Sequence, residues 1–140
     1  MRTVDWRPRM EENLQRVKST PFEWGVHDCA LFAASHVNAI SADPEHRNLD
    51  EVFKGKYSTA LGSIKALKQQ GYDSLRDLLK SKFEEIHPAF AGRGDLVIAL
   101  DEEGNQAIGI CLGEHCGFLR PEGYGYLIRT SQMIKWAYRV

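Results

Sequence analysis

The segment from Asp28 to Ile40 constrains the fold of this chain more than any other. Cys29 is followed by eleven residues that are apolar on most sides, and Asp28 is a residue type preferred at helix N-caps. A helix that is apolar around most of its circumference must be buried. We therefore expect a central buried helix over Cys29–Ile40, with the Cys29 thiol in its first turn.

The rest of the chain changes from helical to extended patterns. Helical spacing predicts helices at Pro8–Lys18, Leu49–Phe53, Thr59–Gln69 and Leu75–Phe83, with Gly71 as the C-cap of the third of these. Alternating and β-branched residues predict strands at Asp95–Leu100, Ala107–Leu112, Cys116–Leu119, Gly125–Ile128 and Lys135–Val140. Helices first and strands afterwards indicate an α+β domain with a small antiparallel sheet.

Chain length is compatible with one domain. The 140 residues are enough for one core without disulfides or metal, so we expect a single domain over residues 1–140. We expect that core to include Trp24, Leu31, Phe32, Val37, Leu67, Leu96, Ile98, Ile108, Ile110 and Trp136.

Charge and hydropathy exclude several classes of function. The net charge is −1 and the basic residues are scattered, which argues against nucleic-acid binding. The first ten residues carry four charged side chains and lack the apolar stretch of a secretory signal. No segment reaches the length and apolarity of a membrane span. We therefore expect a soluble protein that has no membrane span and does not bind nucleic acid.

The three cysteines could be structural residues, metal ligands or, for Cys29, a nucleophile. Their odd number and wide spacing do not indicate a disulfide framework, and they suit a reducing compartment. Cys111, His115 and Cys116 are candidate metal ligands, but a structural zinc site needs four ligands, and only His27 and Cys29 remain to complete it. We expect neither a metal nor a cofactor.

Cys29 is the candidate nucleophile. Unpaired N–H groups and the dipole at a helix start favour thiolate over thiol, whose ordinary pKa is about 8.5. A free cysteine at such a position is also often just a small buried apolar residue.

The motifs around this cysteine resemble a known enzyme group. Trp24-Gly25 followed by Asp28-Cys29, and later Gly94-Asp95-Leu96-Val97 leading into Ile108–Gly113, are similar to the NlpC-type peptidoglycan peptidases. The whole chain, including its ending Trp136–Val140, resembles a family of small phage and prophage proteins that are encoded among tail genes and are related to the NlpC group. The resemblance implies a papain-like NlpC-type fold with Cys29 at the nucleophile position.

The same resemblance implies a degenerate catalytic site. Ala107 stands where NlpC-type enzymes have the catalytic histidine, and no polar residue around Gly117–Leu119 can orient one. A thiol without a base cannot readily attack an amide. His27, two residues before Cys29, is the candidate substitute base, although it approaches from the loop side.

Two further residues are candidate binding residues. In the related enzymes the aspartate at the position of Asp28 helps to recognise the free amine of a peptidoglycan stem peptide, and Trp24 is placed to line the groove. Helix capping explains Asp28 equally well, and packing explains Trp24. We expect His36 to be a core or boundary residue, and His46, His87 and His115 to lie at the surface.

The functional expectation combines these observations. The protein is expected to be a structural or docking module of a phage tail tip or of tail assembly, made in the bacterial cytoplasm and located in the virion tail, with hub or tail-tip proteins as partners. The alternative is an active cysteine peptidase or amidase that cleaves peptidoglycan during DNA entry, with Cys29 as nucleophile and His27 or a partner-supplied group as base. A metal-binding protein is the third hypothesis.

Overall fold

The computed structural model describes residues 1–130 and 133–140. The helices in these residues are α1 (Trp6–Lys18), α2 (Cys29–Ile40), α3 (Ala60–Gln69) and α4 (Leu75–Lys82), with 3₁₀ turns η1 (Pro44–His46), η2 (Leu49–Val52) and η3 (Pro88–Phe90). The strands are β1 (Glu84–Ile86), β2 (Leu96–Leu100), β3 (Gln106–Cys111), β4 (His115–Leu119), β5 (Tyr126–Thr130) and β6 (Ile134–Arg139).

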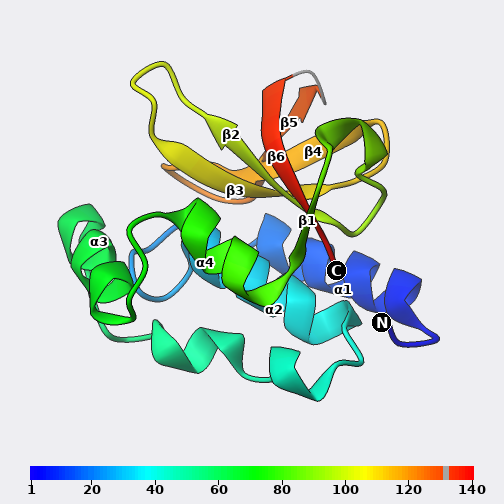
Figure 1. Ribbon diagram of the computed structural model, residues 1–140, viewed down its shortest axis with the longest axis horizontal. Coiled ribbons are helices and arrows are strands. Elements are labelled where there is room, and N and C mark those ends of the chain that lie inside the picture. The colour runs from blue at the N-terminus through cyan, green and yellow to red at the C-terminus, as the bar shows by residue number, and fades with distance from the viewer. Residues whose placement is uncertain (131–132) are drawn as a thin grey trace.

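The described residues form two layers, a helical layer and a sheet. The strands pair in the order β1-β6-β2-β3-β4-β5, and every pairing is antiparallel. Figure 1 shows α1, α2 and α4 on one side of this sheet, with α3 at the periphery. We call the side of the sheet that these helices cover the helical face and the other side the second face.

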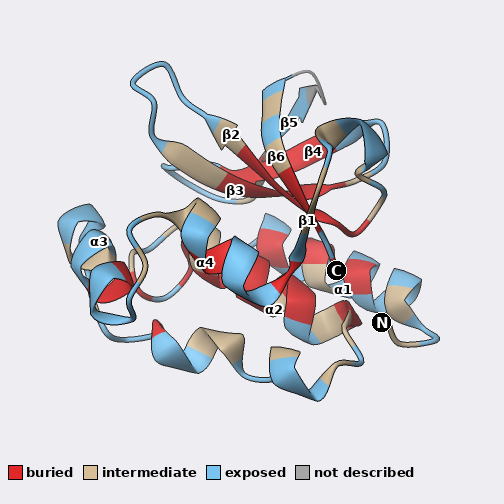
Figure 2. Cartoon of the chain, viewed as in Figure 1, coloured by how far each residue is buried: buried red, intermediate tan, exposed pale blue. Residues whose placement is uncertain are grey.

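The main core lies between the helices and the helical face. Alternate residues of the central strands, such as Leu96, Ile98 and Ile108, meet the apolar side of α2 there, and α1 contributes Met10, Leu14 and Val17. In Figure 2 the central strands and parts of α2 are coloured as buried. The first turn of α2 is therefore held against β3 by the largest apolar cluster of the protein.

The second face carries a smaller apolar cluster. It is formed by the strand residues that point away from the helices: Val97, Cys111, Cys116, Phe118 and Ala137. Ile86 and Ala91, which flank η3, pack against this cluster from outside the central strands. Both faces of the central strands are thus apolar, which explains why β2 reads as a continuous hydrophobic run rather than as an alternating pattern.

The predicted α+β class and antiparallel sheet are confirmed. The predicted helix over Cys29–Ile40 has the bounds of α2. Each of the other predicted elements has an observed counterpart, and no end of a predicted element differs from the observed end by more than two residues. Strand β1 was not predicted because its three residues, Glu84, Glu85 and Ile86, lack a β-type alternation. Trp24 and Trp136 are only partly buried, whereas the other eight residues expected in the core are buried.

An arginine joins the two ends of the described chain. Arg2 donates to Val140 O at 2.8 Å, to Arg93 O at 2.8 Å and to Asp95 Oδ1 at 2.9 Å. Asp95 is 4% exposed and also accepts from the backbone N–H groups of Gly92 and Val140. The Gly-Asp start of β2 is therefore a structural junction between the N-terminal segment, β2 and β6, and both termini lie beside it in Figure 1.

In the part of the chain that the structure describes, no helix combines the length and the apolarity needed to cross a membrane.

Candidate functional site

The Asp28 carboxylate organises the turn before α2. Asp28 is 1% exposed, and its Oδ1 accepts a hydrogen bond from Leu31 N at 3.1 Å, as an N-cap does. Its Oδ2 accepts from Gly25 N at 3.0 Å and from the hydroxyl of Tyr57 at 2.5 Å. Burial and the bond to this carboxylate raise the pKa of Tyr57, which therefore stays a donor. Three internal donors occupy Asp28.

The backbone conformation explains the glycine of the Trp24-Gly25 pair. Gly25 has φ +81°, a conformation that side chains rarely adopt, and a Cβ at this position would collide with the carbonyl oxygen of Tyr57. Gly25 O also accepts from Gly55 N at 2.8 Å. The half-buried Trp24 packs edge-on against Phe22, with ring centroids 5.0 Å apart. The chain thus needs glycine at position 25 to bring the Tyr57 segment against the start of α2.

Cys29 occupies the first turn of α2 and faces the sheet. Burial raises the pKa of the Cys29 thiol to about 11, and the neighbouring Asp28 carboxylate adds to this effect. The backbone N–H groups of Ile108 and Ala30 oppose it, because they stabilise the thiolate. Burial thus outweighs the helix start in its effect on the pKa and favours the protonated thiol, although the residue as a whole is only half-buried.

His27 lies in the loop just before α2. It borders a cavity of about 160 Å³ whose walls are Arg16, Val26, His27, Leu31, Ser35, Asn38, Asp50 and Lys54. Leu31, Ser35 and Asn38 share the face of α2 opposite to Cys29, because residues three and four apart stack on one side of a helix. His27 Nε2 is buried without a hydrogen-bond partner, and burial lowers the pKa of its ring. The ring also lies edge-on to the core residue Phe32, with centroids 6.3 Å apart, and no hydrogen bond joins its Nε2 to the Cys29 thiol.

The other histidines are placed as follows. His36 is fully buried and its Nε2 bonds Gly94 O at 2.7 Å, while burial lowers its pKa to about 4. His115 is the exposed first residue of β4, and His87 is also exposed. The prediction for His46 was wrong in part, because its ring is half-buried, stacks near Phe83 and bonds a serine hydroxyl at 2.7 Å.

The strand opposite Cys29 presents no imidazole at its start. Ala107 points to the second face of the sheet, where it packs against the apolar cluster, while Ile108 faces the helices. The preceding Gln106 uses its Oε1 to accept a hydrogen bond from Arg76 N at 3.0 Å, which caps the beginning of α4. The polar end of β3 is thereby engaged with α4.

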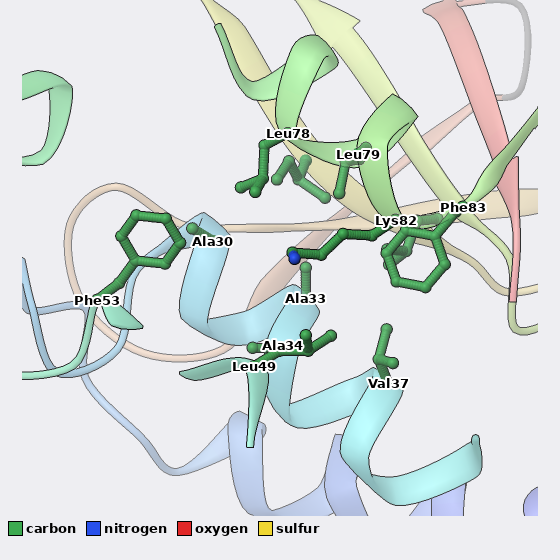
Figure 3. A pocket seen from close by; sticks show the side chains of 12 residues that line it. Ala30, Ala33, Ala34, Val37, Leu49, Phe53, Leu78, Leu79, Lys82 and Phe83 are labelled. Atoms are coloured by element: carbon green, nitrogen blue, oxygen red, sulfur yellow. The ribbon is translucent and has the colours of Figure 1, made fainter. Parts of the chain in front are cut away.

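An apolar cavity adjoins the Cys29 turn. Its volume is about 40 Å³, and it lies between α2, α4 and the helical face of the sheet. Figure 3 shows Ala30, Ala33 and Ala34 on one wall, Leu78 and Leu79 on the other, and the Lys82 side chain extending across the space between them. Ligand pockets usually measure several hundred Å³ (roughly 300–1,000 Å³). This cavity is a packing gap rather than a substrate pocket.

The candidate metal ligands do not converge. Cys111 and Cys116 lie opposite each other on the second face, whereas His115 is exposed at the neighbouring strand position, whose side chain points the other way. Among the residues that the structure describes, no group of three or more His, Cys, Asp or Glu side chains is placed to hold a metal ion. The described geometry gives the hypothesis of a metal site at these residues no support.

Comparison with known proteins places the sequence in one family. A family model described as a domain of unknown function, DUF6950, matches residues 1–140. The chain belongs to the DUF6950 family. No curated protein matches it.

In this DUF6950 chain the residues before α2 form a hydrogen-bonded turn that leads directly into Cys29. Sequence reasoning found Cys29 and Asp28 through the helix start, but it missed Tyr57. Tyr57 lies 29 positions from its carboxylate partner, in a segment without a clear helix or strand pattern. The glycine at position 25, which lets the Tyr57 backbone approach closely, was a sequence signal for this contact. These bonds hold the backbone shape of the turn, and among the described residues the His27 imidazole makes no hydrogen bond through its Nε2.

Proposed function

We propose that this DUF6950 chain is a docking module of a phage tail tip or of tail assembly, and that it has a papain-like, NlpC-type fold without efficient catalysis. The order of its elements supports the fold, since a cysteine-bearing helix precedes an antiparallel sheet and packs against its central strands. The tail context and the hub or tail-tip partners rest on the resemblance to phage tail-gene products.

The protonated state of Cys29 carries the non-catalytic part of this proposal. A thiol with a pKa of about 11 is ionised in roughly one molecule in ten thousand at pH 7. An attacking thiol needs a base and the leaving amine needs an acid. His27 Nε2 has no hydrogen-bond partner, and Ala107 packs on the second face of the sheet. The site therefore retains a nucleophile position without the groups that would activate it.

An active cysteine peptidase or amidase is the second candidate. The placement of Cys29 at the start of α2, where the backbone N–H groups of Ile108 and Ala30 favour its thiolate, supports this candidate. A partner protein that supplied an imidazole beside β3 would complete such a site. Its substrate would be a peptidoglycan stem peptide.

Two paired measurements separate these functions. The phage or prophage that encodes the chain is produced with the wild-type protein, with Cys29→Ala, or without the protein, and assembled tails are purified and counted. The docking function predicts that the protein is present in tails or tail intermediates, that its absence abolishes infectious particles, and that Cys29→Ala restores them fully. Loss of infectivity with Cys29→Ala, despite normal folding, would contradict it.

The same tails provide the second measurement. Intact tails with wild-type protein or Cys29→Ala are incubated with purified peptidoglycan, and released amino groups are counted. The docking function predicts equal release by both, because any hydrolysis comes from other tail proteins. Release that depends on Cys29 would establish the peptidase in its place.

A further inference from the structure

Two buried thiols face each other on the second face of the sheet, away from the Cys29 turn. Cys111 ends β3 and Cys116 lies near the start of β4, and the two are direct partners in the antiparallel register. They are 2% and 1% exposed. Neither has a part in the function proposed above, so their pairing needs an explanation of its own.

The backbone hydrogen bonds determine what kind of pair this is. Cys111 N donates to Asp95 O at 2.8 Å and Cys111 O accepts from Gly94 N at 2.8 Å, so both backbone groups of Cys111 point toward β2. Cys111 and Cys116 are therefore a non-hydrogen-bonded pair of β3 and β4. The next pair along these strands is hydrogen-bonded, from Leu112 N to His115 O at 2.8 Å, as expected because the two kinds of pair alternate. Directly opposed residues of such pairs have Cα atoms about 4.5 Å apart, and their side chains are the closer ones.

That spacing lies inside the range of disulfides, roughly 4.4–6.8 Å between Cα atoms, at its short end. We propose that Cys111 and Cys116 are a redox-active dithiol that closes reversibly to a cross-strand disulfide when the protein meets a peroxide. Disulfides at the edge of the allowed geometry are strained and are reduced more easily. The bond is therefore reversible in a reducing compartment.

The reaction is balanced with hydrogen peroxide as oxidant. The Cys111 thiolate attacks one peroxide oxygen, the O–O bond breaks, and the leaving hydroxide takes up the proton that Cys111 released. This gives a sulfenic acid at Cys111. The Cys116 sulfur then attacks the Cys111 sulfur, the S–O bond breaks, and water leaves with the Cys116 proton. Two thiols lose two electrons in total, and one peroxide becomes two waters.

The surroundings of the pair assign the two roles. The hydrogen bond between the two thiols lowers the pKa of Cys111 and raises that of Cys116, where burial acts in the same direction. The guanidinium of Arg93, which donates to the neighbouring Leu112 O at 2.8 Å, places a positive charge on the Cys111 side of the pair. We therefore assign the attack on peroxide to Cys111 and the resolving step to Cys116. Because both thiols are buried, the reaction requires local opening of the strand ends at the exposed turn of Gly113 and Glu114.

The test uses the full native chain. It is treated with hydrogen peroxide, quenched, denatured, alkylated at remaining thiols, and cleaved after Glu114, which lies between the two cysteines. The expected product holds the two fragments together until reductant is added, and Cys29 alone is alkylated. Fragments that separate without reductant, or a bond to Cys29, would overturn the proposal.

Two controls make the outcome specific. Cys29→Ala leaves the pairing unchanged, whereas Cys116→Ala abolishes it and leaves Cys111 as a free thiol or an over-oxidised acid.

Discussion

Replacement of Asp28 by alanine tests whether this carboxylate is held by the fold rather than kept free for a ligand. In the folded chain it accepts three hydrogen bonds, from Leu31 N, Gly25 N and the Tyr57 hydroxyl. Asp28→Ala removes both carboxylate oxygens, which together accept these three bonds, and leaves the donors beside a new gap. We expect it to be among the most destabilising single changes in this chain.

The magnitude follows from the partners. Loss of an N-cap side chain costs about 1 kcal/mol. A hydrogen bond to a charged group contributes about 1.5–3 kcal/mol, and a buried donor left unpaired costs about 1–3 kcal/mol. Because Gly25 N–H and the Tyr57 hydroxyl share one oxygen, their losses are not additive. The expected decrease in the free energy of unfolding is therefore about 3–5 kcal/mol.

Thr59 and Ser74 provide matched controls. Each is an N-cap whose side chain accepts a single bond, from Gly62 N at 3.0 Å and from Asp77 N at 3.1 Å, at exposed sites. Their replacement by alanine is expected to cost about 1 kcal/mol. Denaturant unfolding of the three variants gives the comparison. If Asp28→Ala costs no more than Thr59→Ala, the bonds to Gly25 and Tyr57 do not stabilise the turn, and our explanation is wrong.

Three further changes test the rest of the fold. His36 has a folded-state pKa of about 4 against 6.5 when unfolded, so the unfolded state binds the proton first and stability should fall by about 3 kcal/mol as pH decreases from 6.5 to 4. His36→Gln should remove most of this slope in denaturant titrations at several pH values; an unchanged slope would assign it to other groups. Gly109→Ala places a Cβ 2.5 Å from an aromatic carbon of Phe118 in β4, so it should lower the free energy of unfolding by about 1–3 kcal/mol or more. Gly92→Ala, whose new Cβ has its nearest atom at 3.9 Å, should lower it by less in the same assay. Equal costs would show that the strands separate readily. Arg2→Lys should lower the thermal midpoint because an ammonium cannot replace the planar fork that reaches Asp95; an unchanged midpoint would show that this junction contributes little.

The elements with strong local patterns could be predicted from the sequence. The bounds of α2 follow from Asp28 as N-cap and an apolar run behind it, and the β2–β3 hairpin follows from two apolar segments around a glycine turn. Strand β1 could not be predicted, because Glu84 and Glu85 become a strand only through pairing with the end of β6. Its stability comes from tertiary partners rather than from local propensity.

In the candidate site, too, features set by local sequence could be predicted and features set by tertiary contacts could not. The position of Cys29 in a helix start was predictable, but the direction of its pKa was not, because dipole and burial act oppositely and the burial depends on β3. The placement of His27 likewise depends on which face of α2 its loop approaches. Cys111 and Cys116 were read as possible metal ligands because sequence spacing gives no strand register.

The thiol pKa of Cys29 tests the central claim most directly. The rate of alkylation of the folded protein is measured against pH in a chain whose other two cysteines are replaced by alanine. Our account predicts that the rate rises with a pKa of about 11 and that His27→Gln leaves the profile unchanged. A pKa well below the ordinary value of about 8.5, with a second titration that disappears in His27→Gln, would contradict it and identify an activated nucleophile.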